Sequence, residues 1–347
     1  MRTNTLKILR FYIFLSLATC NVLFVSAQTT DSIPQKYTSL SEALKRPKDV
    51  IYLDLTGVQK ISPEIKKLRN LKVLYISNSN LKNLPPEIGR LSKLTELYAD
   101  NNSFSELPKE FSRLRKLKIL SLTGNNFTEF PEQVCLLNKL EKLYLSNNKI
   151  DKITDNIKRL RKLKILDLSF NRIDNLPVDI GRISGLINLL LSNNRLENLP
   201  ESIMKFKNLK QIYLDKNSLK KFPLNLCKME ILEVISLHEN QISNIPKEIG
   251  NLKLLKILIL SNNKISKLPN EIGNLKNLQI LILANNNLKK IPENICNLNN
   301  LVDLNLYNND IEKIPEKISK LPNIESLGIG GNKIFELSKS FSGIKIY

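Results

Sequence analysis

The sequence predicts one quasi-linear solenoid of stacked repeats rather than two globular domains. A segment of the form Leu-x-x-Leu-x-Leu begins at residue 71 and recurs at every 23rd residue as far as 324, with conservative replacements and no insertion. An Asn stands eight residues after nearly every start, and an apolar residue followed by Pro often comes five residues later. A strict period of this length indicates a repeat array, so it overrides the two domains that 347 residues would otherwise suggest.

Each part of the repeat has a predicted structural role. Apolar and variable residues alternate at the end of Leu-x-x-Leu-x-Leu, which indicates a short strand with one buried face. The Pro forces a turn, and the segment that follows, such as 88–91, supplies two apolar anchors from a short 3₁₀ or irregular helical turn. The repeated Asn is expected to hydrogen-bond neighbouring turn backbones and to form a ladder along the stack. The ladder residues are Asn102, Asn125, Asn148, Asn171, Asn194, Asn217, Asn240, Asn263, Asn286, Asn309 and Asn332.

The N-terminus carries the pattern of a secretory signal peptide over residues 1–27. Three basic and no acidic residues precede an apolar stretch that ends in Val-Ser-Ala. We expect cleavage after Ala27, which would leave no transmembrane span. The alternative is an uncleaved membrane anchor, although the apolar stretch is short for the roughly 20 residues that a span needs.

The rest of the chain divides into a cap and the repeats. Residues 28–49 are predicted to form a linker and a cap helix over 38–46, with Ser39 and Glu42 as its capping box. Residues 50–70 form a shortened first repeat, and residues 71–346 form twelve full repeats. Residues 335–347 are predicted to cap the C-terminal end.

The repeat resembles the 23-residue type of the leucine-rich repeat family, L-x-x-L-x-L-x-x-N-x-L-x-x-L-P-x-x-I-x-x-L-x-x. This type is found in Ras-suppressor-like proteins and in many bacterial secreted proteins. The resemblance covers residues 50–346. It implies an α/β-type solenoid, a horseshoe with a parallel β-sheet on the concave face and short irregular or 3₁₀ turns on the convex face. It also implies a binding module without enzymatic activity, because family members are overwhelmingly non-catalytic.

Variable strand positions are predicted to face solvent on the concave side, where two groups are candidate partner-binding residues. One group is a discontinuous line of tyrosines, a residue type favoured at interfaces. The other is an exposed aliphatic patch, although β-branched residues also suit strands for structural reasons alone. The candidates are Tyr75, Tyr98, Tyr144, Tyr213, Val234, Ile257, Ile259, Ile280 and Ile282.

A basic column on the convex side is the second candidate surface. The chain carries 53 Lys and Arg against 33 Asp and Glu, a formal net charge of +20. The candidate anion-binding residues stand nineteen residues after their repeat starts, and they are Arg90, Arg113, Arg159 and Arg182. This column could attract an anionic surface or an acidic glycan, or it could be an ordinary solvated surface. Nucleic acid is not expected, because the chain carries a secretory leader and no aromatic residue interleaves with the column.

Catalytic and metal-binding patterns are missing from the sequence, and no cofactor is expected. The single His238 excludes zinc-protease and histidine-triad motifs. Cys135, Cys227 and Cys296 recur at one place in their repeats, separated by four and then three repeats. At about 4.8 Å per repeat they are too far apart for disulfides, so they are predicted to be buried apolar residues.

The sequence therefore predicts a non-enzymatic protein–protein interaction module that binds a protein ligand through its concave face. We expect it to be secreted, periplasmic or at the cell surface. A structural or adhesive protein, held to anionic surfaces by the basic column, is the first alternative. An intracellular signalling scaffold is the second, if the signal-peptide interpretation is wrong.

Overall fold

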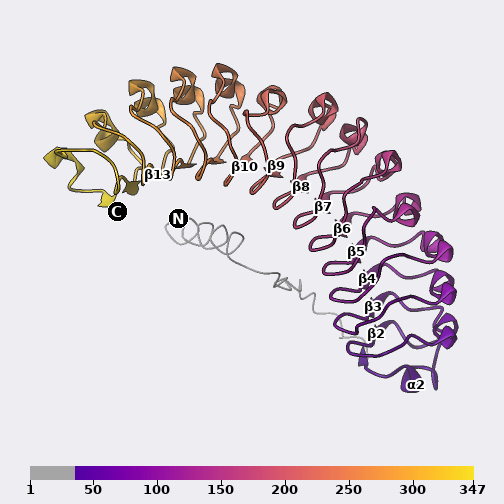
Figure 1. The fold of residues 1–347 in the computed structure, drawn as a ribbon. Coiled ribbons are helices and arrows are strands. Elements are labelled where there is room, and N and C mark those ends of the chain that lie inside the picture. The colour runs from indigo at the N-terminus through magenta and orange to yellow at the C-terminus, as the bar shows by residue number, and fades with distance from the viewer. Residues whose placement is uncertain (1–35) are drawn as a thin grey trace. The chain divides into compact units, whose positions relative to one another are not determined.

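A computed structural model describes residues 36–347. The predicted signal peptide, residues 1–27, lies outside the described residues, as do residues 28–35 of the predicted linker. The described part forms one compact unit in which parallel strands pair in chain order from β1 to β15. Figure 1 shows these strands along the inner side of an open arc and the helical turns along its outer side.

The strands are short, and each pairs with the strand of the next repeat. The strands are β1 (Lys36–Tyr37), β2 (Tyr52–Asp54), β3 (Val73–Tyr75), β4 (Glu96–Tyr98), β5 (Ile119–Ser121), β6 (Lys142–Tyr144), β7 (Ile165–Asp167), β8 (Asn188–Leu190), β9 (Gln211–Tyr213), β10 (Val234–Ser236), β11 (Ile257–Ile259), β12 (Ile280–Ile282), β13 (Asp303–Asn305), β14 (Ser326–Gly328) and β15 (Lys345–Ile346). From β3 to β14 the register advances by one full repeat at each step, as in Leu74 opposite Leu97 and Leu97 opposite Leu120. The sequence period therefore sets the strand register.

Every repeat crosses the outer side in a single turn of 3₁₀ helix. Pro85 shows why: its φ is −67°, and its carbonyl accepts an i→i+3 bond from the Ile88 amide at 3.0 Å. The turns are η1 (Pro63–Lys67), η2 (Pro86–Arg90), η3 (Lys109–Arg113), η4 (Glu132–Leu136), η5 (Asp155–Arg159), η6 (Ile180–Arg182), η7 (Glu201–Lys205), η8 (Leu224–Lys228), η9 (Lys247–Asn251), η10 (Asn270–Asn274), η11 (Glu293–Asn297), η12 (Glu316–Lys320) and η13 (Lys339–Phe341). These turns and the parallel sheet confirm the predicted solenoid.

The core is a continuous column of apolar side chains between the sheet and the outer turns. It runs from Tyr37 to Phe341, and the strand leucines Leu74, Leu97 and Leu120 are fully buried in it. One repeat could not bury these side chains alone, because each leucine is covered by its counterparts in the repeats before and after it.

The repeated Asn residues join neighbouring repeats through their side chains. Asn102 Oδ1 accepts a hydrogen bond from the Leu81 amide at 2.9 Å, and Nδ2 donates to the carbonyls of Ile76 and Ala99 at 2.8 and 3.1 Å. Asn101 before it has a positive φ of 53°, which turns the chain out of the strand. The same set of contacts recurs at all eleven ladder residues.

Short caps flank the repeats. At the N-terminal end, α2 (Leu40–Ala43) is one turn long and buries Ala43. The prediction that the Ser39 side chain caps this helix is wrong. Its hydroxyl pairs with the Ser41 hydroxyl at 2.7 Å and accepts no hydrogen bond from a helix amide. At the C-terminal end, β15 pairs with β14 and Phe341 packs into the core. Residues 36–347 contain no helix of the length and hydrophobicity that crossing a bilayer would require.

Candidate functional site

Three tyrosines stack on the concave sheet at its N-terminal end. The rings of Tyr75 and Tyr98 lie 4.5 Å apart between centroids, at an interplanar angle of 11°. Tyr52 extends this stack with a tilted ring, whose centroid lies 5.3 Å from that of Tyr75 at an interplanar angle of 35°. Tyr52 was not among the predicted partner-binding residues, because its repeat is shorter than the others. Aligning Tyr52 with Val73 despite the shorter spacing would have found it, and the pairing of β2 with β3 confirms that alignment.

Carboxylates and a lysine surround the stack. The Lys36 ammonium lies 3.0 Å from Asp54 and 5.8 Å from the centroid of the Tyr52 ring. Although burial acts in the opposite direction, hydrogen bonds from Thr56 and the ammonium of Lys36 lower the pKa of Asp54. The Tyr98 hydroxyl donates to Glu96 at 3.0 Å. Burial and this carboxylate raise the pKa of Tyr98, so the phenol stays neutral and keeps its proton as a donor.

The other two predicted tyrosines do not join this stack. Tyr144 lies two strands beyond Tyr98, with Ser121 on the strand between them. Tyr213 is only 7% exposed, and its hydroxyl donates to Gln211 at 3.2 Å. The structure therefore brings together two of the four predicted tyrosines and adds Tyr52.

The predicted aliphatic patch is largely buried, which corrects the expectation that it is exposed. Val234, Ile257 and Ile280 are 4%, 6% and 3% exposed, whereas Ile259 and Ile282 are half-buried. The first three lie directly opposite one another on β10, β11 and β12. Strands about 4.8 Å apart bring β-branched side chains into contact, so these side chains cover each other. Little apolar surface is left there for a partner.

Partly buried aspartates on the concave side join adjacent repeats. Asp215 accepts hydrogen bonds from the His238 amide at 2.8 Å, from the Ser236 hydroxyl, and from the Ser192 hydroxyl at 3.2 Å. Burial raises the pKa of Asp215. Asp100 repeats the arrangement with the Ser121 hydroxyl and the Thr123 amide. These clusters were not predicted from the sequence, although an Asp after one strand and a Ser on the strand of the next repeat are the pattern that indicates them.

The single histidine belongs to the same polar network. His238 Nδ1 lies 2.7 Å from the Ser261 hydroxyl, and Nε2 lies 2.8 Å from a Glu239 carboxylate oxygen. Ser261 is 8% exposed and lies one repeat after His238, so this hydrogen bond joins two neighbouring repeats below the surface. Across residues 36–347, no three His, Cys, Asp or Glu side chains gather closely enough to hold a metal ion.

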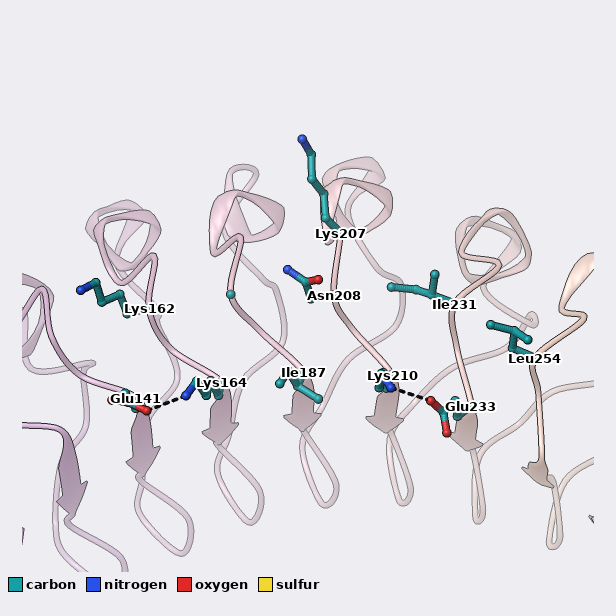
Figure 2. A pocket seen from close by; sticks show the side chains of 11 residues that line it. Glu141, Lys162, Lys164, Ile187, Lys207, Asn208, Lys210, Ile231, Glu233 and Leu254 are labelled. Carbon is teal, nitrogen blue, oxygen red and sulfur yellow. Dashed lines mark hydrogen bonds and ion pairs between the residues drawn. The ribbon is translucent and has the colours of Figure 1, made fainter.

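A groove runs along the flank of the sheet, where the chain enters strands β6 to β11. It has a volume of about 530 Å³, and Ile187, Ile231 and Leu254 give it an apolar lining. Figure 2 shows ion pairs at its rim. Lys164 pairs with Glu141 at 2.7 Å, and Lys210 with Glu233 at 2.9 Å. Two further lysines, Lys162 and Lys207, also line the groove, so four lysines against two glutamates give its lining a net positive charge.

The basic column is exposed but is not uniform. Arg90 and Arg113 end η2 and η3, and Arg159 and Arg182 end η5 and η6. All four side chains are exposed. Leu136 takes the corresponding place at the end of η4 and separates the two pairs. Arg159 and Arg182, the second pair, line a hollow on the outer side.

Comparisons with known proteins identify the repeat. A family model described as leucine rich repeat matches residues 69–127, 92–150 and 115–173, and a leucine-rich repeat region model matches residues 146–258 and 240–332. No curated protein matches the chain in sequence.

Solved structures share the fold over most of the chain. A leucine-rich repeat protein of Leptospira interrogans is 31% identical, with 91% of this chain and 100% of that chain covered and a TM-score of 0.72. An internalin of Listeria monocytogenes is 22% identical, covers 87% of each chain and has a TM-score of 0.76. The plant peptide hormone receptor RGFR1, solved in complex with RGF2, is 27% identical over 81% of this chain and 54% of that chain, with a TM-score of 0.62.

Proposed function

This chain belongs to the leucine-rich repeat family, and we propose that it is a non-enzymatic protein that binds a protein partner on its concave sheet. The family matches extend from residue 69 to residue 332. One structural relative is a receptor solved in complex with RGF2. A solenoid of this kind presents a long, rigid inner surface, which suits recognition of another chain.

The stack of Tyr52, Tyr75 and Tyr98 carries the proposal. Tyrosine supplies a large contact area and loses little conformational entropy on binding, so it is a frequent interface anchor. Here the rings are already ordered by contact with each other, at centroid distances of 4.5 and 5.3 Å. A partner that docks on them would therefore bind a preorganised surface.

The chemistry around the stack favours a partner segment that carries Lys or Arg. The chain's own Lys36 already combines an ion pair to Asp54 with a position over the Tyr52 ring. Glu96 and Tyr98 offer the same combination of a carboxylate and an aromatic ring two strands further along. A cationic side chain of a partner would gain both attractions there.

The residue pattern at the N-terminus supports a location of the protein outside the cytoplasm. We propose that residues 1–27 are a signal peptide cleaved after Ala27, and that the mature chain is secreted, periplasmic or at the cell surface. Residues 28–49 then serve as linker and cap ahead of the repeats in 50–346. N-terminal sequencing of the mature protein tests this, because a chain that still begins at Met1 would favour an anchor or an intracellular scaffold.

A capture experiment tests the binding site. The mature chain, a Tyr75→Ser/Tyr98→Ser variant and a Tyr307→Ser control are immobilised and exposed to envelope and neighbouring-cell surface extracts. Tyr307 is a 47%-exposed tyrosine near the other end of the sheet, so the control removes the same residue type elsewhere. A protein held by the wild type and the control but lost from the double variant supports the proposal. Equal capture by all three baits, each with a native circular dichroism spectrum, contradicts it.

A further inference from the structure

A hollow of about 750 Å³ lies on the outer side of the solenoid, between the ends of η5, η6 and η7. Six of its eight lining residues are cationic, and the other two, Gly181 and Ser184, are small. The cations are Lys158, Arg159, Arg161, Arg182, Lys205 and Lys207. They come from three consecutive repeats, at the last residues of each 3₁₀ turn and in the segment directly after it.

The positive charge of this hollow is mostly uncompensated. Asp179 pairs with Lys158 at 2.8 Å and with Arg182 at 3.1 Å. Among residues 36–347, no carboxylate lies within 4.0 Å of the charged nitrogens of the remaining four cations, Arg159, Arg161, Lys205 and Lys207. Asp179 therefore pairs with two of the six cations, and the other four have no acidic partner within that distance. Like charges held this close repel one another, and a bound anion would relieve that repulsion.

The outer side carries this charge unevenly. Leu136 interrupts the basic column on one side of the hollow. On the other side the corresponding positions are first Lys228, then Asn251, Asn274 and Asn297, and finally Lys320. Gly181, one of the lining residues, lets two neighbouring outer turns lie close together. A Cβ atom there would lie 1.8 Å from the Ser202 carbonyl oxygen, so the backbones of η6 and η7 approach closely where a side chain would otherwise stand.

We propose that this hollow is a binding site for a polysaccharide that carries sulfate or phosphate groups. Guanidinium groups bind tetrahedral oxyanions through paired hydrogen bonds, and the site offers three of them, with lysines alongside. A linear polymer with repeated charges would follow the row of cations from one repeat to the next. None of the eight lining residues is aromatic or a large aliphatic residue, so the hollow lacks the groups that insert into lipid. It also lacks the aromatic platforms on which nucleic-acid bases stack.

A matched pair of variants tests the site. Arg159→Gln/Arg161→Gln removes two unpaired cations from the hollow. Arg172→Gln/Arg195→Gln removes two exposed arginines that lie outside the hollow, in two adjacent repeats, and thus lowers the net charge equally. The probes are a heparin octasaccharide, a phosphorylated mannan fragment, unsulfated hyaluronan, a DNA duplex and phosphatidylglycerol vesicles. Binding is measured by titration calorimetry at physiological ionic strength, or by sedimentation for vesicles.

We expect the wild type to bind the sulfated or the phosphorylated glycan more tightly than the other three probes. Comparison of these two glycans shows whether the site prefers sulfate or phosphate esters. The hollow variant should weaken this binding about tenfold, which corresponds to about 1.4 kcal/mol, and the control variant less than twofold. The bound glycan should also raise the melting temperature of the wild type more than that of the hollow variant. Equal weakening in both variants, tighter binding to DNA or vesicles, or no glycan binding at millimolar concentration would overturn the proposal.

Discussion

The phenol rings of Tyr75 and Tyr98 stack because their strands hold them directly opposite each other. Tyr75 pairs with Tyr98 in the register of β3 and β4, and the ring centroids are 4.5 Å apart. In a parallel sheet whose register equals the repeat length, any residue type that recurs at one place in consecutive repeats becomes a continuous row. Two repeated features of this molecule follow from that rule, the buried Asn ladder and the basic hollow.

The stacked rings of Tyr75 and Tyr98 should show a measurable energetic coupling. We expect a double-mutant cycle of Tyr75→Leu and Tyr98→Leu to give a coupling energy of about 1 kcal/mol in urea unfolding, the usual size for an aromatic pair. Tyr98→Phe keeps the ring and removes the hydroxyl that donates to Glu96, so it should retain most of that coupling. A coupling energy near zero would show that the two rings pack independently.

Loss of one ladder Asn should be costly. Asn194→Ala leaves the buried amide of Ile173 and the carbonyls of Leu168 and Leu191 without their side-chain partner, so we expect a loss of about 2–3 kcal/mol in the free energy of unfolding. Asn198→Ala is the control, because Asn198 is exposed four residues further along. Chemical denaturation of both variants measures the difference. Equal stability of the two would mean that water replaces the ladder bonds.

A glycine in the outer turns should resist substitution. A Cβ atom at Gly273 would lie 2.1 Å from the Asn294 carbonyl oxygen, so Gly273→Ala must push η10 away from η11. We expect a loss of about 2 kcal/mol or more. At Gly343 a Cβ atom would meet nothing within 4 Å, so Gly343→Ala should leave the urea midpoint nearly unchanged. Similar midpoints for both variants would contradict this packing.

Asp215 should make stability depend on pH. Burial raises the pKa of Asp215, so the folded chain retains a proton that the unfolded chain has already lost. This contribution is fully present below the unfolded pKa of about 3.9 and is lost as the pH rises through the folded pKa. We therefore expect Asp215→Asn, compared with wild type, to gain relative stability as the pH rises from 3 to 7. The exposed control Asp174→Asn should show no such trend.

The three cysteines of the repeats should react slowly and unequally with thiol reagents. Burial raises the pKa of Cys135 and of Cys227 to about 12, so their thiolate fraction at pH 8 is very small. Cys296 is more accessible and should be labelled first. Timed alkylation with peptide mapping measures the order. Prompt labelling of Cys135 or Cys227 in the folded chain would indicate that the outer turns open readily.

The sequence alone predicted most of the fold but only part of the candidate site. The strict repeat period predicted strand positions, outer turns and register, because each repeat must present the same apolar face to its neighbours. It placed Tyr75 and Tyr98 correctly on the inner face. It wrongly expected Val234, Ile257 and Ile280 to be exposed, since a pattern shows which side of a strand a residue occupies but not how closely adjacent side chains pack on that side.

The sequence by itself determined the repeat, its register and the residue types available on each surface, because these depend on local periodicity. The tertiary structure alone decided which residues act together: the addition of Tyr52 to the stack, the bonds from His238 and Ser236 to Asp215, and the gathering of six cations around one hollow. The physical reason is distance. Residues about one repeat apart in the sequence become neighbours only after the repeats stack, and their packing then sets burial, hydrogen bonding and charge compensation.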